Sequence, residues 1–146
     1  MNAIARNARH SLFVIAIGSA LLMAWAPFSA QAEDVKVMLS GGQEVPPVTS
    51  SGAGSGTISI SDDKTVTGSV TTTGVTGTMA HIHNGAAGKN GPVVVPLSKS
   101  GDNTWAVPPG AKLTDAQYAA FKAGDLYVNV HSAQHQGGEI RGQLKP

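Results

Sequence analysis

Apolar and polar positions alternate over most of the chain beyond residue 33, and this period of two is typical of β-strands that bury one face. The first alternating stretch places Val35, Val37 and Leu39 at every second position. It stops at Gly41-Gly42, a pair of turn-forming residues. The pattern therefore predicts a short first strand that ends in a turn.

The same signal recurs at short intervals along the rest of the chain. Residues 50–55 are typical of a low-complexity linker. A turn at 62–64 separates apolar alternation at 58–60 from a Thr-rich stretch at 66–70, which predicts a hairpin. Further strands are predicted at 78–83, 92–97, 103–107, 126–131 and 139–144.

One helix interrupts these strands. Thr114 is a good N-cap, Gln117 completes a capping box, and Gly124 stands where a C-cap glycine belongs. We expect a lid of two to three turns whose buried side carries Leu113, Tyr118 and Phe121. The chain is thus predicted to be all-β, a Greek-key β-sandwich or barrel of about seven to nine short strands with one short helix.

The N-terminal segment has the features of an export signal. Arg6 and Arg9 precede an apolar stretch at 12–26, and Ala30-Gln31-Ala32 is a small-x-small cleavage site. Gly18 and Ser19 interrupt an apolar run already shorter than the roughly 18 to 20 residues of a membrane-spanning helix. We therefore predict a signal peptide over residues 1–32, a mature domain over 33–146, and a periplasmic or secreted location.

Composition excludes several functional classes. The chain of 146 residues has no Cys, so disulfides, thiolate metal sites and Cys nucleophiles are excluded. Its formal net charge is +1, and without Arg6 and Arg9 eight basic residues face nine acidic ones. We expect no nucleic-acid partner and, after signal cleavage, no membrane partner, while a protein partner is left open.

The chemistry is concentrated in the histidines of the predicted mature domain, which form two pairs. His81 and His83 are two apart in a predicted strand, so they share one face, with Met79 on the same face. His131 ends another predicted strand, and His135 follows in a loop that can fold back.

Neutral imidazole is the commonest metal ligand, and a set of His without Cys suits copper, zinc or nickel. We predict a metal site formed by His81, His83, His131 and His135, with Met79 and Glu44 as additional candidate ligands. The Met79 thioether favours copper over zinc. The alternative is that each His is a hydrogen-bonded strand-end residue without a ligand.

The sequence lacks the motifs of several common enzyme classes. The sequence has no nucleophile elbow, no phosphate-binding loop and no close carboxylate pair suited to glycoside hydrolysis. Glu139 and Arg141 share a strand face, which predicts an ordinary ion pair. No catalytic residue is assigned, and whether the protein is an enzyme is left open.

Three segments in order resemble the successive signatures of the CHRD domain family, named after chordin. They are 39–47 (LSGGQEVPP), 80–94 with AHIHNGAAG and NGPVV, and 126–143 with LYVNVH, His135 and GGEIRGQ. The resemblance covers nearly the whole mature chain. It implies a β-sandwich-like extracellular domain, as in chordin, where such domains lie within a binder of growth factors.

A second resemblance concerns the histidines. A His-x-His strand, a Gly-rich loop and a later His are similar to the copper half of copper/zinc superoxide dismutases. That resemblance implies His81 and His83 as a ligand pair and His131 as a third ligand. The chain lacks the Cys pair and the Asp/His-rich zinc loop of that family.

We therefore expect an exported CHRD-type domain that binds a transition metal, copper foremost and zinc as the alternative, for metal storage, delivery or resistance. Two other functions fit the same sequence. One is a metal-free extracellular interaction or structural module, and the other is a redox enzyme of dismutase type.

Overall fold

The computed structural model describes residues 31–146. The predicted signal peptide over 1–32 lies almost entirely outside the described residues and stays a prediction. Within residues 31–146 no helix is both long and apolar enough to cross a membrane.

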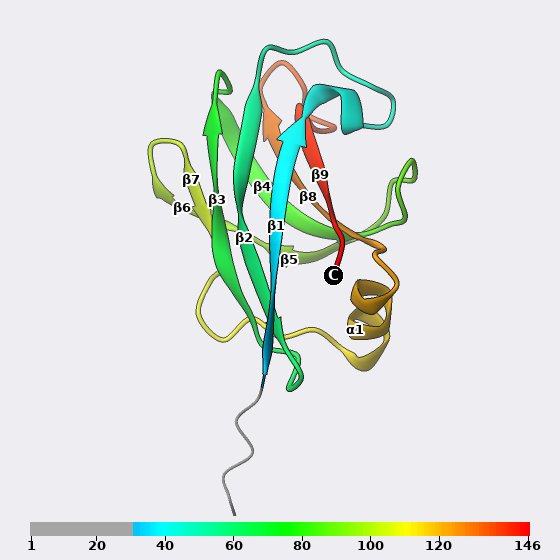
Figure 1. Ribbon diagram of the computed structural model, residues 1–146. Helices are drawn as coiled ribbons and strands as arrows, with labels where there is room; N and C mark the ends of the chain where they lie inside the picture. Colours follow the sequence, from blue (N-terminus) through cyan, green and yellow to red (C-terminus); the bar gives the residue numbers. More distant parts are fainter. Residues whose placement is uncertain (1–30) are drawn as a thin grey trace, which may run out of the picture.

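Residues 31–146 form nine antiparallel strands in the order β5-β4-β8-β9-β1-β2-β3-β7-β6, curled into two facing layers (Figure 1). A 3-10 turn, η1, and one helix, α1, complete the described elements. Their bounds are β1 Ala32–Ser40, η1 Gly41–Gln43, β2 Ala53–Ser61, β3 Val66–Thr73, β4 Gly77–Asn84, β5 Val93–Pro96, β6 Ser98–Gly101, β7 Thr104–Ala106, α1 Asp115–Lys122, β8 Leu126–Ser132 and β9 Ile140–Leu144. The predicted all-β fold with one short helix is confirmed.

The core lies between the layers and is built from the alternating positions. Val35, Val37 and Leu39 of β1 are at most 4% exposed. Ala80 and Ile82 of β4 and the apolar positions of β8 and β9 pack into the same cluster, with Val128, Val130, Ile140 and Leu144 fully buried. The inner face of β4, β8 and β9 is therefore apolar, which leaves their polar residues on the outer face.

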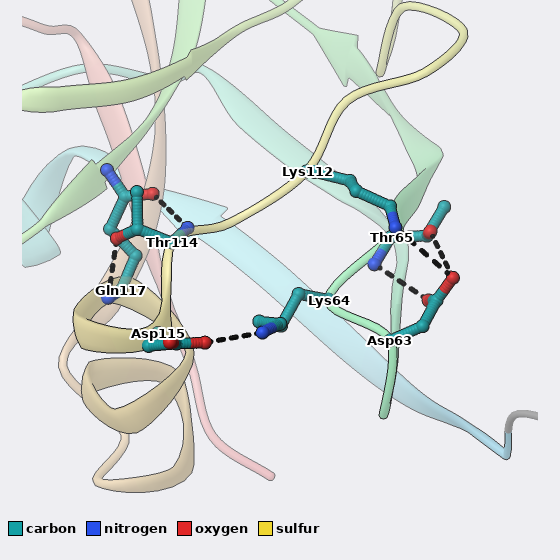
Figure 2. A network of polar contacts seen from close by, with 7 residues as sticks. All are labelled: Asp63, Lys64, Thr65, Lys112, Thr114, Asp115 and Gln117. Atoms are coloured by element: carbon teal, nitrogen blue, oxygen red, sulfur yellow. Dashed lines mark hydrogen bonds and ion pairs between the residues drawn. The ribbon is translucent and has the colours of Figure 1, made fainter.

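Helix α1 begins and ends where its caps predict. The Thr114 hydroxyl accepts a hydrogen bond from the Gln117 amide, and the Gln117 side chain accepts one from the Thr114 amide (Figure 2). Gly124 follows the helix with φ of 77°, the left-handed conformation that glycine adopts without strain. Phe121 is fully buried, so the helix packs on one end of the barrel, as Figure 1 shows.

Strands β2 and β6 differ most from the sequence prediction. Strand β2 begins at Ala53, inside the segment expected to be a linker. Strand β6 was not predicted, because its four residues, SKSG, are all exposed and carry no apolar alternation.

Candidate functional site

The predicted histidines lie on the outer face of β4 and β8, which are neighbours in the sheet. In their register His81 is opposite Asn129 and His83 is opposite Tyr127. Met79 is opposite His131, which places the third histidine one step along the same face. The alternation of side chains sets the face, and the pairing of β4 with β8 brings the two sequence segments together.

His81, His83 and His131 form one compact group. One ring nitrogen from each histidine lies within 4.8 Å of the others, and His81 Nδ1 is 3.0 Å from His131 Nε2. Three nitrogens that each lie about 2.0 Å from one ion are closer to one another than this, so small ring rotations would bring the three histidines to binding distance. His83 and His131 are 8% and 7% exposed, while His81 is half-buried at the rim.

Backbone carbonyls fix the protonation of two of these rings. His131 Nδ1 donates to the carbonyl of Gln136 at 2.8 Å, and His83 Nδ1 donates to the carbonyl of Gly91 at 2.9 Å. Since a carbonyl only accepts, each Nδ1 carries the proton and each neutral ring presents a lone pair at Nε2. A carbonyl on the second ring nitrogen is the usual arrangement for a metal-ligating histidine.

Within the described structure the lone pair of His83 has no donor in hydrogen-bonding geometry, although the Asn129 side chain lies close enough to act on the pKa of this ring. His83 Nε2 is buried and has no hydrogen-bond partner among the described residues. Burial lowers the pKa of His83, and burial together with the neighbouring His131 lowers the pKa of His81. Both rings are therefore neutral at pH 7 and able to act as ligands.

A stack of side chains holds His83 in place. Its ring lies parallel to Tyr127, with centroids 4.9 Å apart and 3° between the planes. The Arg141 guanidinium lies over Tyr127 with Cζ 3.4 Å from the ring centroid, and the Tyr127 hydroxyl accepts a hydrogen bond from Gly91 N. The stack spans β4, β8 and β9, so the orientation of His83 depends on all three strands.

Glu44 lies behind this stack and apart from the three histidines. It is 4% exposed, and its Oε1 has no hydrogen-bond partner among the described residues. Burial raises the pKa of Glu44 to about 7, although Arg141 and a hydrogen bond from Asn129 act in the opposite direction. A Cβ on Gly138 would come within 2.5 Å of this carboxylate, which explains the glycine with φ of 130° at that position.

We expect Glu44→Gln to flatten the pH dependence of stability. The pKa of Glu44 is raised from 4.5 to about 7, so the folded protein holds the proton that the unfolded chain releases between these values. Wild-type stability therefore falls as pH rises through this window, by up to about 3 kcal/mol. Urea unfolding at pH 5 and pH 8 measures the difference. Equal pH dependence in wild type and variant would contradict the raised pKa.

The other predicted ligands lie outside this group of three histidines. Within residues 31–146 the group able to hold a metal comprises the three histidines and includes neither His135 nor Glu44. His135 lies in the loop between β8 and β9, where it lines a cleft of about 480 Å³ together with Glu44. Met79 is 49% exposed and adjoins the group through its pairing with His131.

The predicted ion pair between Glu139 and Arg141 is wrong. The Glu139 carboxylate accepts a hydrogen bond from Ser50, and Arg141 is not among its partners. The Arg141 guanidinium donates to Asn90, to the carbonyl of Ala86 and to Gln143. Glu139 precedes β9, which begins at Ile140, and the loop over the outer face supplies the partners of Arg141.

Sequence reasoning missed Tyr127, Asn129 and Arg141 as parts of the site. Tyr127 and Asn129 alternate with His131 along the strand, and this alternation, which places them on one face, was the available signal. The segments that cover that face were not predicted. They are the loops 41–48 and 85–91, which bury Tyr127 and Asn129.

The arrangement offers three imidazoles with one ring at the solvent rim. Three His with an open side bind zinc, copper or nickel and leave a position for an exchangeable ligand. Oxygen-preferring ions such as Ca²⁺ and Mg²⁺ do not match this set.

Comparison with known proteins identifies the family. No curated protein and no solved structure matches the chain significantly. The family model described as the CHRD domain matches residues 35–144, nearly all of the described sheet. The resemblance of the three sequence segments to this family is thereby confirmed, and the chain belongs to the CHRD domain family.

Proposed function

We propose that this protein is an extracellular metal-binding domain that holds one transition-metal ion, copper foremost, through His81, His83 and His131. Its role is metal storage, delivery or resistance. Membership of the CHRD family suggests an extracellular module, and the signal peptide predicted over 1–32 agrees with this location.

One observation carries the proposal. The buried Nε2 of His83 has no partner among the described residues, while its Nδ1 is held by a backbone carbonyl. An unpaired buried acceptor costs free energy unless a ligand satisfies it. A metal ion shared with His131, which has the same carbonyl support, would satisfy it.

The choice of copper rests on the surroundings of the group. Imidazole binds both copper and zinc, so the histidines alone do not separate them. Met79 adjoins His131 across the strand pair and is accessible, and a thioether stabilises Cu(I). The partial exposure of His81 suits uptake and release of the ion more than permanent burial.

Calorimetric titration of metal-free protein with Cu²⁺ and with Zn²⁺ tests the proposal. We expect one site per chain and tighter binding of copper. Because protons compete for imidazole and the pKa values of His81 and His83 are lowered, affinity should hold at pH 7 and fall only below about 6.5. Copper binding that is unchanged at pH 5 would contradict ligation by histidine.

The absence of any saturable site in the same titration would favour the metal-free interaction module. The three histidines would then serve as a hydrogen-bonded layer that joins β4 and β8 to the covering loops. For copper-loaded protein, a superoxide assay separates metal storage from dismutase activity.

A further inference from the structure

A second cleft lies on the outer face of β1 and β9, next to the loop that follows β4. Its volume is about 530 Å³, and its cationic lining residues are Lys36, Arg141 and Lys145. Gln43 and Gln143 add amide groups, and the described residues that line it include no carboxylate. The cleft therefore concentrates three positive charges in a domain whose charges are nearly balanced.

The lysines near α1 are in a different situation. Lys64 pairs with Asp115, and Lys112 pairs with Asp63, as Figure 2 shows. Lys122 pairs with Glu33 at 2.6 Å. In residues 31–146 neither Lys36 nor Lys145 has a carboxylate within ion-pair distance. The fold neutralises these three lysines and leaves Lys36 and Lys145 without a counter-charge in contact.

Arg141 forms the buried part of the cleft wall. It is 1% exposed, yet its hydrogen bonds go to neutral acceptors, namely Asn90, the carbonyl of Ala86 and Gln143. A buried cation is costly without an opposite charge in contact. Stacking on Tyr127 and the field of Glu44 offset part of that cost. Both Nη2 hydrogens of Arg141 are used by Ala86 and Gln143, so the guanidinium offers an anion its positive charge more than free N–H groups.

We propose that this cleft binds a small anion that carries phosphate or carboxylate groups. Arg141 supplies buried positive charge, and Lys36 and Lys145 supply further charge and N–H donors in the lining. The volume is that of a small-molecule site, so the ligand is a metabolite-sized anion. The two lysines of the cleft lie outside the histidine group, so their replacement tests the anion site apart from the metal site.

Titration of metal-free, full-length protein with inorganic phosphate tests this site, with succinate as a separate carboxylate arm. Binding is followed by the NMR shifts of the Arg141 side chain and the Gly88 amide. We expect saturable shifts with at least one of the two anions. The double variant Lys36→Gln/Lys145→Gln should weaken binding by about tenfold. The matched control Lys99→Gln/Lys112→Gln removes the same charge elsewhere and should leave binding within about twofold.

Either of two results would overturn the proposal. Equal weakening by both double variants would show a general charge effect, and the absence of saturable shifts with both anions would show that the cleft is empty. Arg141 is kept in all these variants, because it also stacks on Tyr127 beside His83. Thermal unfolding confirms that each variant is folded before titration.

Discussion

Replacing His81 by alanine lowers copper affinity by at least about a hundredfold and barely changes the stability of the metal-free protein. His81 supplies one of three ligands, and removal of a ligand exceeds the 10- to 100-fold loss typical of outer-shell changes. Its ring is half-buried and contacts His131 through Nδ1, so its loss should cost less than about 1 kcal/mol of stability. Competition with a chelator measures the affinity, and urea unfolding measures the stability.

His135→Ala is the matched control for this variant. His135 is also a histidine of residues 31–146, but it lies outside the group of three. Copper affinity within about threefold of wild type is the expected result. A loss equal to that of His81→Ala would mean that the loop between β8 and β9 closes over the metal.

Replacing the next residue, Ile82, has the opposite profile. Ile82 is fully buried in the core, and Ile-to-Ala changes at such positions cost about 2 to 5 kcal/mol. Copper affinity should stay within about threefold of wild type, because the side chain lies on the other face of β4. Urea unfolding measures the free energy of unfolding, and copper titration under native conditions measures the affinity.

If Ile82→Ala lost copper affinity as strongly as His81→Ala, the histidine geometry would depend on core packing and not on the strand face alone. A stability loss below about 1 kcal/mol would contradict the burial of Ile82. If His81→Ala lowers only copper affinity and Ile82→Ala lowers only stability, one face of β4 binds the metal and the other packs in the core.

The sequence predicted which face of a strand each side chain lies on better than it predicted which strands pair. Alternation correctly placed His81 and His83 on one face of β4 and Ile82 on the other. It likewise placed His131 and Val130 on different faces of β8. The pairing of β4 with β8 was not deducible, because any two strands with the same alternation can pair. The convergence of the three histidines therefore needed the structure, although the residues themselves were predicted.

Long-range contacts made by loops explain what was missed. Tyr127, Asn129 and Arg141 are buried because loops cover the outer face, whereas alternation alone predicts a solvated face there. Asn90 reaches the carbonyl of Val45, and Arg141 reaches that of Ala86. Such contacts join residues far apart in the chain and leave no periodic signal. The capping box of α1, by contrast, is local and was predicted correctly.

The place of β1 in the sheet has a consequence for the order of folding. Strand β1 lies between β2 and β9, so the first strand of the domain pairs with the last through Ser40 and Arg141. During synthesis the sheet stays open until the final strand has left the ribosome. Pairings this distant in sequence are slow to form, so the chain would remain without native structure for longer than a helical protein of the same size. The pairing of β4 with β8, which brings the three histidines together, also joins distant segments of the chain and is slow to form for the same reason.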